Sequence, residues 1–248
     1  MPDFAAEYLL PRLRASDPSV ELITVTPDGR YERSLEEVEV YYHFTPQNLF
    51  PEVYGKDVLR QILRSTPRLR WFHCAKAGVE EVLVPELVES DIILTNGAGA
   101  PKIAVAETVL AFILADVKEL LAHYAAQRER RWQNRPHREL PGLTVAILGL
   151  GRIGQEIARM CKLMGMRVIG TKRQVSGEPL PYVDEVFPAE RQNECVSQAD
   201  FVVLSAALTP ETRGMVNEST FEAMRPDAAL INVGRGALVD ETALISAL

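Results

Sequence analysis

Val145-Ala-Ile-Leu-Gly-Leu-Gly-Arg-Ile-Gly154 is the stretch of sequence that decides the fold. An apolar, β-branched run enters a turn in which Gly149, Gly151 and Gly154 have G-x-G-x-x-G spacing. A helix is expected directly after the turn, and a second strand at residues 167–171. In that context the glycines allow a tight turn, leave room for a pyrophosphate and let the helix pack closely on the strand. The stretch therefore predicts a dinucleotide-binding unit with phosphates at the helix N-terminus; the alternative is a Gly-rich turn without a ligand.

The end of the second strand indicates which dinucleotide is bound. In the NAD form of this unit, an acidic residue about 20 positions after the glycines binds the ribose 2′-hydroxyl. That position falls at Thr171 or Lys172, and neither is acidic. Lys172 and Arg173 place two cations where an additional 2′-phosphate would lie, and Thr171 adds a small hydroxyl donor. We therefore expect NADP, with NAD as the alternative if both cations simply point into solvent.

Composition places the chain among ordinary globular proteins. It has 248 residues, of which 47% are hydrophobic and 25% charged, and a formal net charge of −7. That charge argues against nucleic acid as a partner, and no apolar run approaches the ~20 residues that a membrane span needs. Because no signal peptide is recognisable, we expect a cytoplasmic protein. Cys74, Cys161 and Cys195 lack C-x-x-C spacing, so neither a disulfide nor a metal site is expected.

Two α/β domains are expected, joined near Asn96-Gly-Ala-Gly-Ala-Pro101, where two glycines and a proline interrupt any regular pattern. In the first domain, residues 1–99, strands are expected at residues 20–25, 38–44, 68–74 and 91–95. The second domain, residues 100–248, begins with one long helix from residue 103 to about residue 131. Its basic end is either a solvated helix terminus or a dimer contact. Because strands alternate with helices, each domain should contain a parallel sheet covered by helices.

Ligands of open parallel sheets bind at the carboxyl ends of the strands. Besides the regions already described, two loops qualify there: residues 206–214, which include Ala206 and Thr212, and Gly234-Arg-Gly236. Arg235 directly follows a strand and is flanked by glycines. Its guanidinium could therefore reach across a cleft between the two domains and bind a carboxylate through two hydrogen bonds. The alternative is an arginine in a surface turn.

Three motifs stand in a specific order: Leu143 to Gly154, Leu208-Thr-Pro-Glu-Thr-Arg-Gly214, and Ile231-Asn-Val-Gly-Arg-Gly-Ala-Leu-Val-Asp-Glu241. Together they resemble the D-isomer specific 2-hydroxyacid dehydrogenases, and the resemblance covers residues 69–248. It implies a Rossmann-type doubly wound parallel sheet that binds NAD(P), a flavodoxin-like α/β substrate domain, and a homodimer. The implied activity is hydride transfer between NADP(H) and a 2-keto acid/D-2-hydroxy acid pair.

The resemblance also assigns roles to single residues. Arg235 matches the family's catalytic arginine, which binds the carboxylate and keto oxygen of the substrate. Ala77 and Gly78 resemble a loop of the substrate domain that binds the carboxylate through backbone N–H groups. Lys172 occupies the usual acidic position, which strengthens the expectation of NADP. With the residues singled out above, the expected cofactor-binding positions are Gly149, Gly151, Arg152, Ile153, Gly154, Thr171, Lys172, Arg173, Ala206, Thr212, Val233 and Gly234.

One departure concerns the proton donor. The family's remaining catalytic residues, a glutamate and the histidine that it orients, would follow Leu248, and none of His43, His73, His123 and His137 lies in the matching place. Reduction of a keto acid needs such an acid tuned near neutral pH. We therefore expect a truncated gene product or an incomplete chain that lacks the sixth strand of its nucleotide-binding sheet. The alternative function is a non-catalytic NAD(P)-binding or sensing module.

Overall fold

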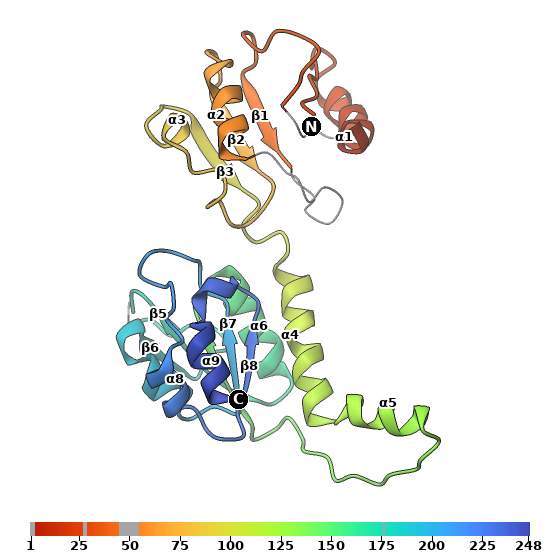
Figure 1. The fold of residues 1–248 in the computed structure, drawn as a ribbon, viewed down its shortest axis with the longest axis vertical. Coiled ribbons are helices and arrows are strands. Elements are labelled where there is room, and N and C mark those ends of the chain that lie inside the picture. Colours follow the sequence, from red (N-terminus) through yellow and green to blue (C-terminus); the bar gives the residue numbers. More distant parts are fainter. Residues whose placement is uncertain (1–2, 27–28, 45–54, 176) are drawn as a thin grey trace. The chain divides into compact units, whose positions relative to one another are not determined.

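The structure is a computed structural model that describes residues 3–26, 29–44, 55–175 and 177–248. The chain divides into two compact units, Met1–Ala100 and Pro101–Leu248 (Figure 1). Each unit contains its own parallel sheet, so the expected α/β fold class is confirmed. None of the helices in these described ranges is long and apolar enough to span a bilayer.

The N-terminal unit is built on a three-stranded parallel sheet in the order β1-β2-β3. Its strands are β1 (Val40–His43), β2 (Trp71–Cys74) and β3 (Ile93–Asn96). Its helices are α1 (Asp3–Ser16), α2 (Lys56–Arg64) and α3 (Pro85–Val88). The carboxyl end of β2 therefore leads into the loop that contains Ala77 and Gly78.

The two faces of this sheet differ in how they are covered. Phe72 and Leu94 lie side by side on one face, where they pack in a core with residues of α2 and α3. Val40, Trp71 and Ile93 lie side by side on the other face and are 52%, 44% and 64% exposed. Parallel sheets are normally covered on both faces. The described part of the chain thus leaves an apolar face of this sheet open to solvent.

The C-terminal unit contains a five-stranded parallel sheet in the order β6-β5-β4-β7-β8. Its strands are β4 (Thr144–Leu148), β5 (Arg167–Lys172), β6 (Glu185–Pro188), β7 (Phe201–Leu204) and β8 (Ala229–Asn232). Its α-helices are α4 (Lys102–Val117), α5 (Leu120–Arg128), α6 (Arg152–Leu163), α7 (Gln192–Val196), α8 (Glu218–Ala223) and α9 (Glu241–Ala247). Two short 3₁₀ helices are η1 (Ala189–Arg191) and η2 (Gly236–Leu238). Counted from β4, the strand order is 3-2-1-4-5, as in doubly wound nucleotide-binding sheets.

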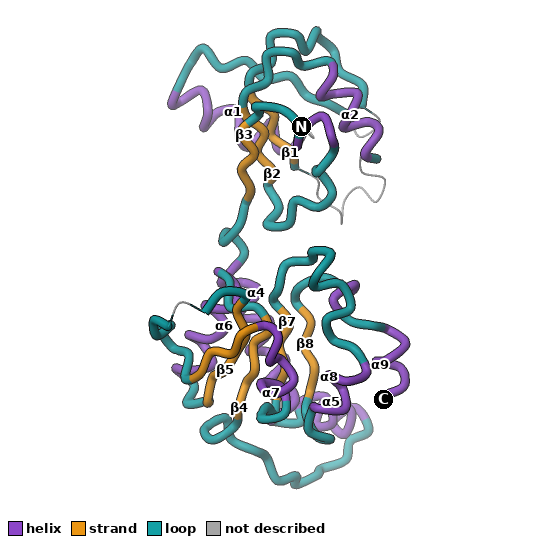
Figure 2. The backbone as a smooth tube through the Cα atoms, turned by 90° about the vertical axis from the view of Figure 1, so that its left-hand side faces the viewer, coloured by secondary structure: helices purple, strands orange, loops and turns teal. Residues whose placement is uncertain are grey.

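The central strand β4 is buried on both faces, because alternate residues enter two different cores. Val145 and Ile147 pack with residues of α4 and α6, whereas Ala146 and Leu148 pack with residues of α7, α8 and α9. Figure 2 shows α4 and α6 on one side of the strands and α8 and α9 on the other. The apolar run before the glycine-rich turn is therefore a core strand that fixes where the turn begins.

The expected strand at residues 20–25 was wrong. Val25 makes only an isolated antiparallel bridge to Tyr31. The backbone N–H of Thr26 donates to the carbonyl oxygen of Arg30, so this segment forms its backbone hydrogen bonds locally. It therefore adds no strand to the N-terminal sheet.

The single long helix expected from residue 103 was also wrong, because the chain breaks at Glu119, which has a left-handed φ of +47°. Contacts with the loop that returns toward β4 hold the break. Arg135 pairs with Glu119 at 2.5 Å, and Arg138 pairs with Asp116 at 2.8 Å. Figure 1 shows α5 extending away from the sheet of this unit after the break.

Asp200, the residue before β7, ties three segments of the C-terminal unit together. Its carboxylate accepts a hydrogen bond from the backbone N–H of Thr144 at 2.7 Å. The same carboxylate forms an ion pair with Arg225 at 3.1 Å. Asp200 is only 5% exposed, whereas the side chain of Arg225 is 43% exposed.

We expect Asp200→Ala to lower the free energy of unfolding by about 2–4 kcal/mol, because a buried N–H and an arginine lose their partner. Asp227→Ala is the matched control. Asp227 pairs with the same arginine at 3.3 Å, but its side chain is 61% exposed. Its loss should stay below about 1 kcal/mol. Urea denaturation measures both values, and equal losses would contradict the role given to Asp200.

Candidate functional site

The glycine-rich turn joins the central strand β4 to α6, and two of its glycines are required by the fold itself. Gly149 has a φ of +106°, and a Cβ there would lie 2.6 Å from the backbone nitrogen of Ala206. A Cβ on Gly154 would lie 2.2 Å from the carbonyl oxygen of Gly149. Neither position has room for a side chain, because backbone faces backbone at both.

Gly151 differs from these two glycines. It is the N-cap residue of α6, it has a φ of −80°, and a Cβ there would meet nothing within 4 Å. No side chain caps this helix, and an uncapped helix N-terminus of this kind can bind an anion through its N–H groups. The open space beside Gly151 is thus the feature of the turn that fits the pyrophosphate of a dinucleotide.

Side-chain and backbone hydrogen bonds brace the turn from both neighbouring strands. The Ser205 hydroxyl donates to the carbonyl oxygen of Gly149 at 2.7 Å. The backbone N–H of Leu150 donates to the carbonyl oxygen of Thr171 at 2.9 Å. The role of Ser205 was not predicted from the sequence, although a single hydroxyl residue directly after the buried strand β7 indicates a side chain that can hydrogen-bond to a neighbouring loop. Arg152 and Ile153, which begin α6, complete the expected set in this region.

The three residues at the end of β5 lie in different environments. Thr171 is only 3% exposed, so it is buried in the sheet. Lys172 is half-buried and Arg173 is exposed. Neither cation forms an ion pair within the described part of the chain. Two positive charges that form no ion pair among the described residues therefore stand beside the glycine-rich turn, because β5 pairs with β4.

The loop after β7 is stiffened by its own side chains. Ala206 packs its backbone against Gly149. The Thr212 hydroxyl donates to the carbonyl oxygen of Ala207 at 2.7 Å and accepts from the backbone N–H of Thr209 at 2.8 Å. Thr212 thus holds the shape of this loop from inside.

Arg235 follows β8 in extended backbone, with a φ of −126°, and its side chain is exposed. Asn232, the last residue of β8, fixes the turn before it. The Asn232 side-chain amide donates to the carbonyl oxygen of Arg235 at 2.9 Å, and its oxygen accepts from the backbone N–H of Gly234 at 2.9 Å. Sequence reasoning missed Asn232, although an asparagine ahead of a glycine turn is a known turn former.

The loops at the carboxyl edge of this sheet touch one another through their backbones. A Cβ on Gly234 would lie 3.1 Å from the carbonyl oxygen of Ala206, and Ala206 itself lies against Gly149. Val233 is tied to the same edge by a hydrogen bond from its N–H to the carbonyl oxygen of Leu204. The structure therefore brings the expected positions 149, 206 and 234 together around the topological switch between β5 and β7.

The N-terminal unit contains the other expected positions. Asn96 donates to the carbonyl oxygen of Ala77 at 2.7 Å. Within the described residues, the N–H groups of Ala77 and Gly78 have no acceptor. His73 is hydrogen-bonded to Thr95 at 2.8 Å. Burial lowers the pKa of His43 to about 4, so its ring is neutral at pH 7.

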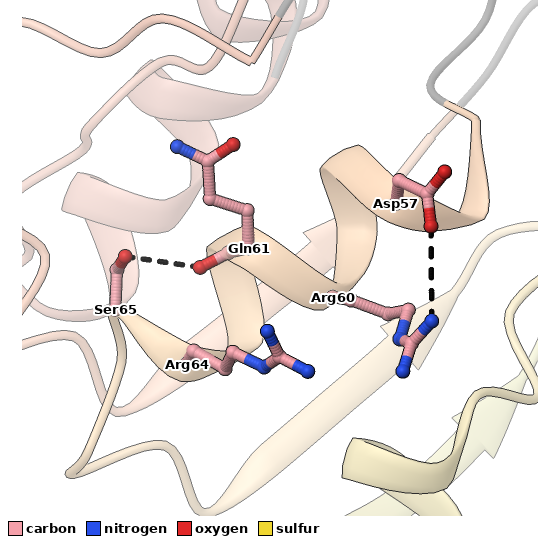
Figure 3. Close-up of a pocket in the computed structure, with 5 residues that line it drawn as sticks. All are labelled: Asp57, Arg60, Gln61, Arg64 and Ser65. Atoms are coloured by element: carbon pink, nitrogen blue, oxygen red, sulfur yellow. Dashed lines mark hydrogen bonds and ion pairs between the residues drawn. The ribbon is translucent and has the colours of Figure 1, made fainter.

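A surface hollow of about 410 Å³ lies apart from these loops, along α2 (Figure 3). Its lining residues are Asp57, Arg60, Gln61, Arg64 and Ser65. Arg60 pairs with Asp57 at 3.7 Å, and both arginines pair with Glu86. Because its cations already have carboxylate partners, this hollow does not offer an anion site. No cluster of metal-ligating side chains is present among the described residues.

Comparison with known proteins identifies the class to which the C-terminal unit belongs. Residues 110–248 match the family model described as "D-isomer specific 2-hydroxyacid dehydrogenase, NAD binding domain". The chain therefore belongs to the D-isomer specific 2-hydroxyacid dehydrogenase family, and the resemblance seen in its three motifs is confirmed.

Several characterised members are similar over much of the chain. A D-3-phosphoglycerate dehydrogenase of Methanocaldococcus jannaschii is 31% identical over 228 residues, which is 86% of this chain and 42% of that protein. The chain thus spans less than half of that relative. A D-isomer specific 2-hydroxyacid dehydrogenase of Xanthobacter autotrophicus Py2, solved with NADPH and MES, is 27% identical with a TM-score of 0.77, covering 98% of this chain and 73% of that one.

A third relative is a solved NADPH-dependent glyoxylate/hydroxypyruvate reductase of Sinorhizobium meliloti, in complex with NADP and sulfate. It is 26% identical with a TM-score of 0.71, and the match covers 87% of this chain and 65% of that one. Two similar structures therefore contain the phosphorylated coenzyme.

We expect Gly154→Ala to lower the free energy of unfolding by roughly 1–3 kcal/mol, because the new methyl group would overlap a backbone carbonyl. Gly151→Ala is the matched control at the same helix end, and its effect should stay within about 0.5 kcal/mol. Urea denaturation of the two variants tests this difference. A Gly151→Ala loss as large as that of Gly154→Ala would show that both glycines serve the fold alone.

Proposed function

We propose that this chain binds NADP(H) at the carboxyl edge of its C-terminal sheet and acts as an oxidoreductase on a 2-keto acid/D-2-hydroxy acid pair. The observation that carries the proposal is the open helix N-terminus at Gly151, which no side chain caps, beside Lys172 and Arg173, which form no ion pair within the described residues. Family membership supports the reaction class. The C-terminal unit is then the dinucleotide-binding domain, and the N-terminal unit is the substrate domain.

The coenzyme preference follows from charge. A phosphate monoester carries about −1.5 to −2 charges at pH 7, and cations without a carboxylate partner attract it most strongly. Lys172 takes the place where an acid would select NAD. The NADPH and NADP bound to two similar proteins agree with this choice.

Arg235 is proposed to bind the substrate. Its guanidinium donates parallel hydrogen bonds to a carboxylate and polarises the keto oxygen, on which negative charge develops as the carbon is reduced. A coenzyme held at the glycine-rich turn would supply hydride chemistry toward the keto carbon. Asn232 orients Arg235 through the backbone. In the N-terminal unit, the N–H groups of Ala77 and Gly78 are proposed to bind a carboxylate.

A second candidate is coenzyme binding without turnover. It is favoured by the contacts of the histidines among the described residues. His73 is hydrogen-bonded to Thr95 at 2.8 Å. His123 and His137 pack on each other, with ring centroids 5.1 Å apart. These rings are held by residues of their own units, whereas reduction of a keto acid needs a proton donor positioned at the substrate.

Calorimetric titration with NADPH and NADH tests the coenzyme. We expect NADPH to bind more tightly, and the double variant Lys172→Ala/Arg173→Ala to weaken NADPH roughly 10- to 100-fold, because two charge-assisted contacts are lost. NADH should change little, which controls for damage to the rest of the site. Gly151→Ala should weaken both coenzymes without lowering stability. A clear preference of the unaltered chain for NADH would reject the assignment of NADP.

The reaction is tested by following the absorbance of NADPH in the presence of glyoxylate or hydroxypyruvate. If the chain turns over, Arg235→Ala should lower kcat/KM by roughly 100-fold or more while the Kd for NADPH stays unchanged. Turnover that survives Arg235→Ala would show that this arginine is not the substrate-binding group. Binding of NADPH with no consumption by either acid would favour the second candidate.

A further inference from the structure

Two charged side chains stand on opposite sides of the glycine-rich turn. Arg173 directly follows β5, and Glu211 lies in the loop that follows β7. Both strands pair in parallel with β4, one on each side. The two residues therefore lie at the same edge of the sheet and flank the place proposed for the dinucleotide.

The loop that contains Glu211 is held in one conformation. The Thr212 N–H donates to the Thr209 hydroxyl at 3.3 Å, and the Thr209 N–H donates to the Thr212 hydroxyl at 2.8 Å. The N–H of Arg213 adds a further bond to the carbonyl oxygen of Thr209 at 3.1 Å. Glu211 lies between Pro210, whose ring fixes its own φ, and Thr212, whose hydrogen bonds to Thr209 close the turn around it.

Electrostatics link Glu211 to the cation across the turn. A hydrogen bond from the Thr209 side chain lowers the pKa of the Glu211 carboxyl below its usual value, and the charge of Arg173 lowers it further. Glu211 is therefore ionised at neutral pH. Within the described residues the two side chains form no ion pair, although the charge of Arg173 acts on the Glu211 carboxyl.

We infer that Glu211 is a specificity-determining residue that limits the preference of this site for NADP over NAD. The inference rests on the proposed binding of NADP(H). The 2′-phosphate would bring a second anion toward Arg173, and the carboxylate of Glu211 would repel it. NAD carries no charge at that position, so the same carboxylate leaves its binding unchanged. Lys172 and Arg173 thus attract the 2′-phosphate against an opposing charge.

The test compares two fragments that differ only at the 2′ position, 2′,5′-ADP and 5′-AMP. Glu211→Gln removes the charge and keeps both the shape and an oxygen that accepts from Thr209. We expect it to tighten 2′,5′-ADP binding by roughly two- to five-fold at low ionic strength and to leave 5′-AMP unchanged. Added salt should shrink the gain, because both groups are exposed to solvent.

Glu222→Gln, an exposed glutamate on α8, is the matched control and should change neither affinity. Thermal unfolding of each variant verifies that the fold is kept. A loss of 2′,5′-ADP affinity in Glu211→Gln, or an equal change for both fragments, would overturn the inference.

The failure of the inference can be told apart from the failure of the proposed function. If the unaltered chain prefers 2′,5′-ADP and Glu211→Gln changes nothing, only the role of Glu211 is rejected. If the unaltered chain binds neither fragment, nor NADPH, the proposed function is rejected and the inference falls with it.

Discussion

The close approach of the Gly149 backbone to Ala206 is the contact on which the carboxyl edge of the C-terminal sheet depends. A side chain at either glycine of the tight turn would push α6 away from β4 or push the loop after β7 outward. Ala206 in turn lies against Gly234, so its position also determines where the loop that carries Arg235 can lie. Three loops from different parts of the chain are thereby fixed backbone against backbone. The resulting surface is made mainly of peptide groups, which suits a polar ligand that must come close.

Charge at this edge is distributed independently of the charge of the whole chain. The formal net charge is −7, yet Lys172 and Arg173 at the end of β5 lack carboxylate partners among the described residues. Elsewhere in the described chain many cations pair with acids, as Arg60 and Arg64 do with Glu86. Unpaired charge concentrated in one place is what attracts an anionic ligand. Net charge therefore says little about ligand preference here, and the local pairing of each cation says much more.

The sequence predicted most reliably those features that neighbouring residues determine. The strand, turn and helix around residues 145–154 were correctly placed, because the apolar run and the glycine spacing constrain the same few dihedral angles. The break at Glu119 was not predictable, since it depends on Arg135 and Arg138, which return from later in the chain. The segment at residues 20–25 was given a strand that it does not form, because the chain there makes local backbone contacts, such as the bridge between Val25 and Tyr31.

Within the candidate site, the motif predicted different roles for its glycines, and the space around them agrees. A Cβ on Gly151, expected to face the pyrophosphate, would meet nothing within 4 Å, whereas a Cβ on Gly154, expected at the helix–strand contact, would meet backbone. Ser205 and Asn232 show the opposite case, because their roles were not predicted. Each is a polar residue at the end of an apolar strand, a pattern that can be recognised in the sequence. Each holds a neighbouring loop through a hydrogen bond.

The open face of the N-terminal sheet has an optical consequence. The chain has two tryptophans, one in each unit: Trp71 on that face and Trp132, which is 96% exposed. The indole of Trp71 donates to Thr95 at 2.7 Å and lies 6.2 Å from the His73 ring. Replacing Trp132 with phenylalanine would leave a single tryptophan. The wavelength of its emission maximum and its fluorescence lifetime would then report whether another part of a protein covers this face of the sheet and excludes water from it.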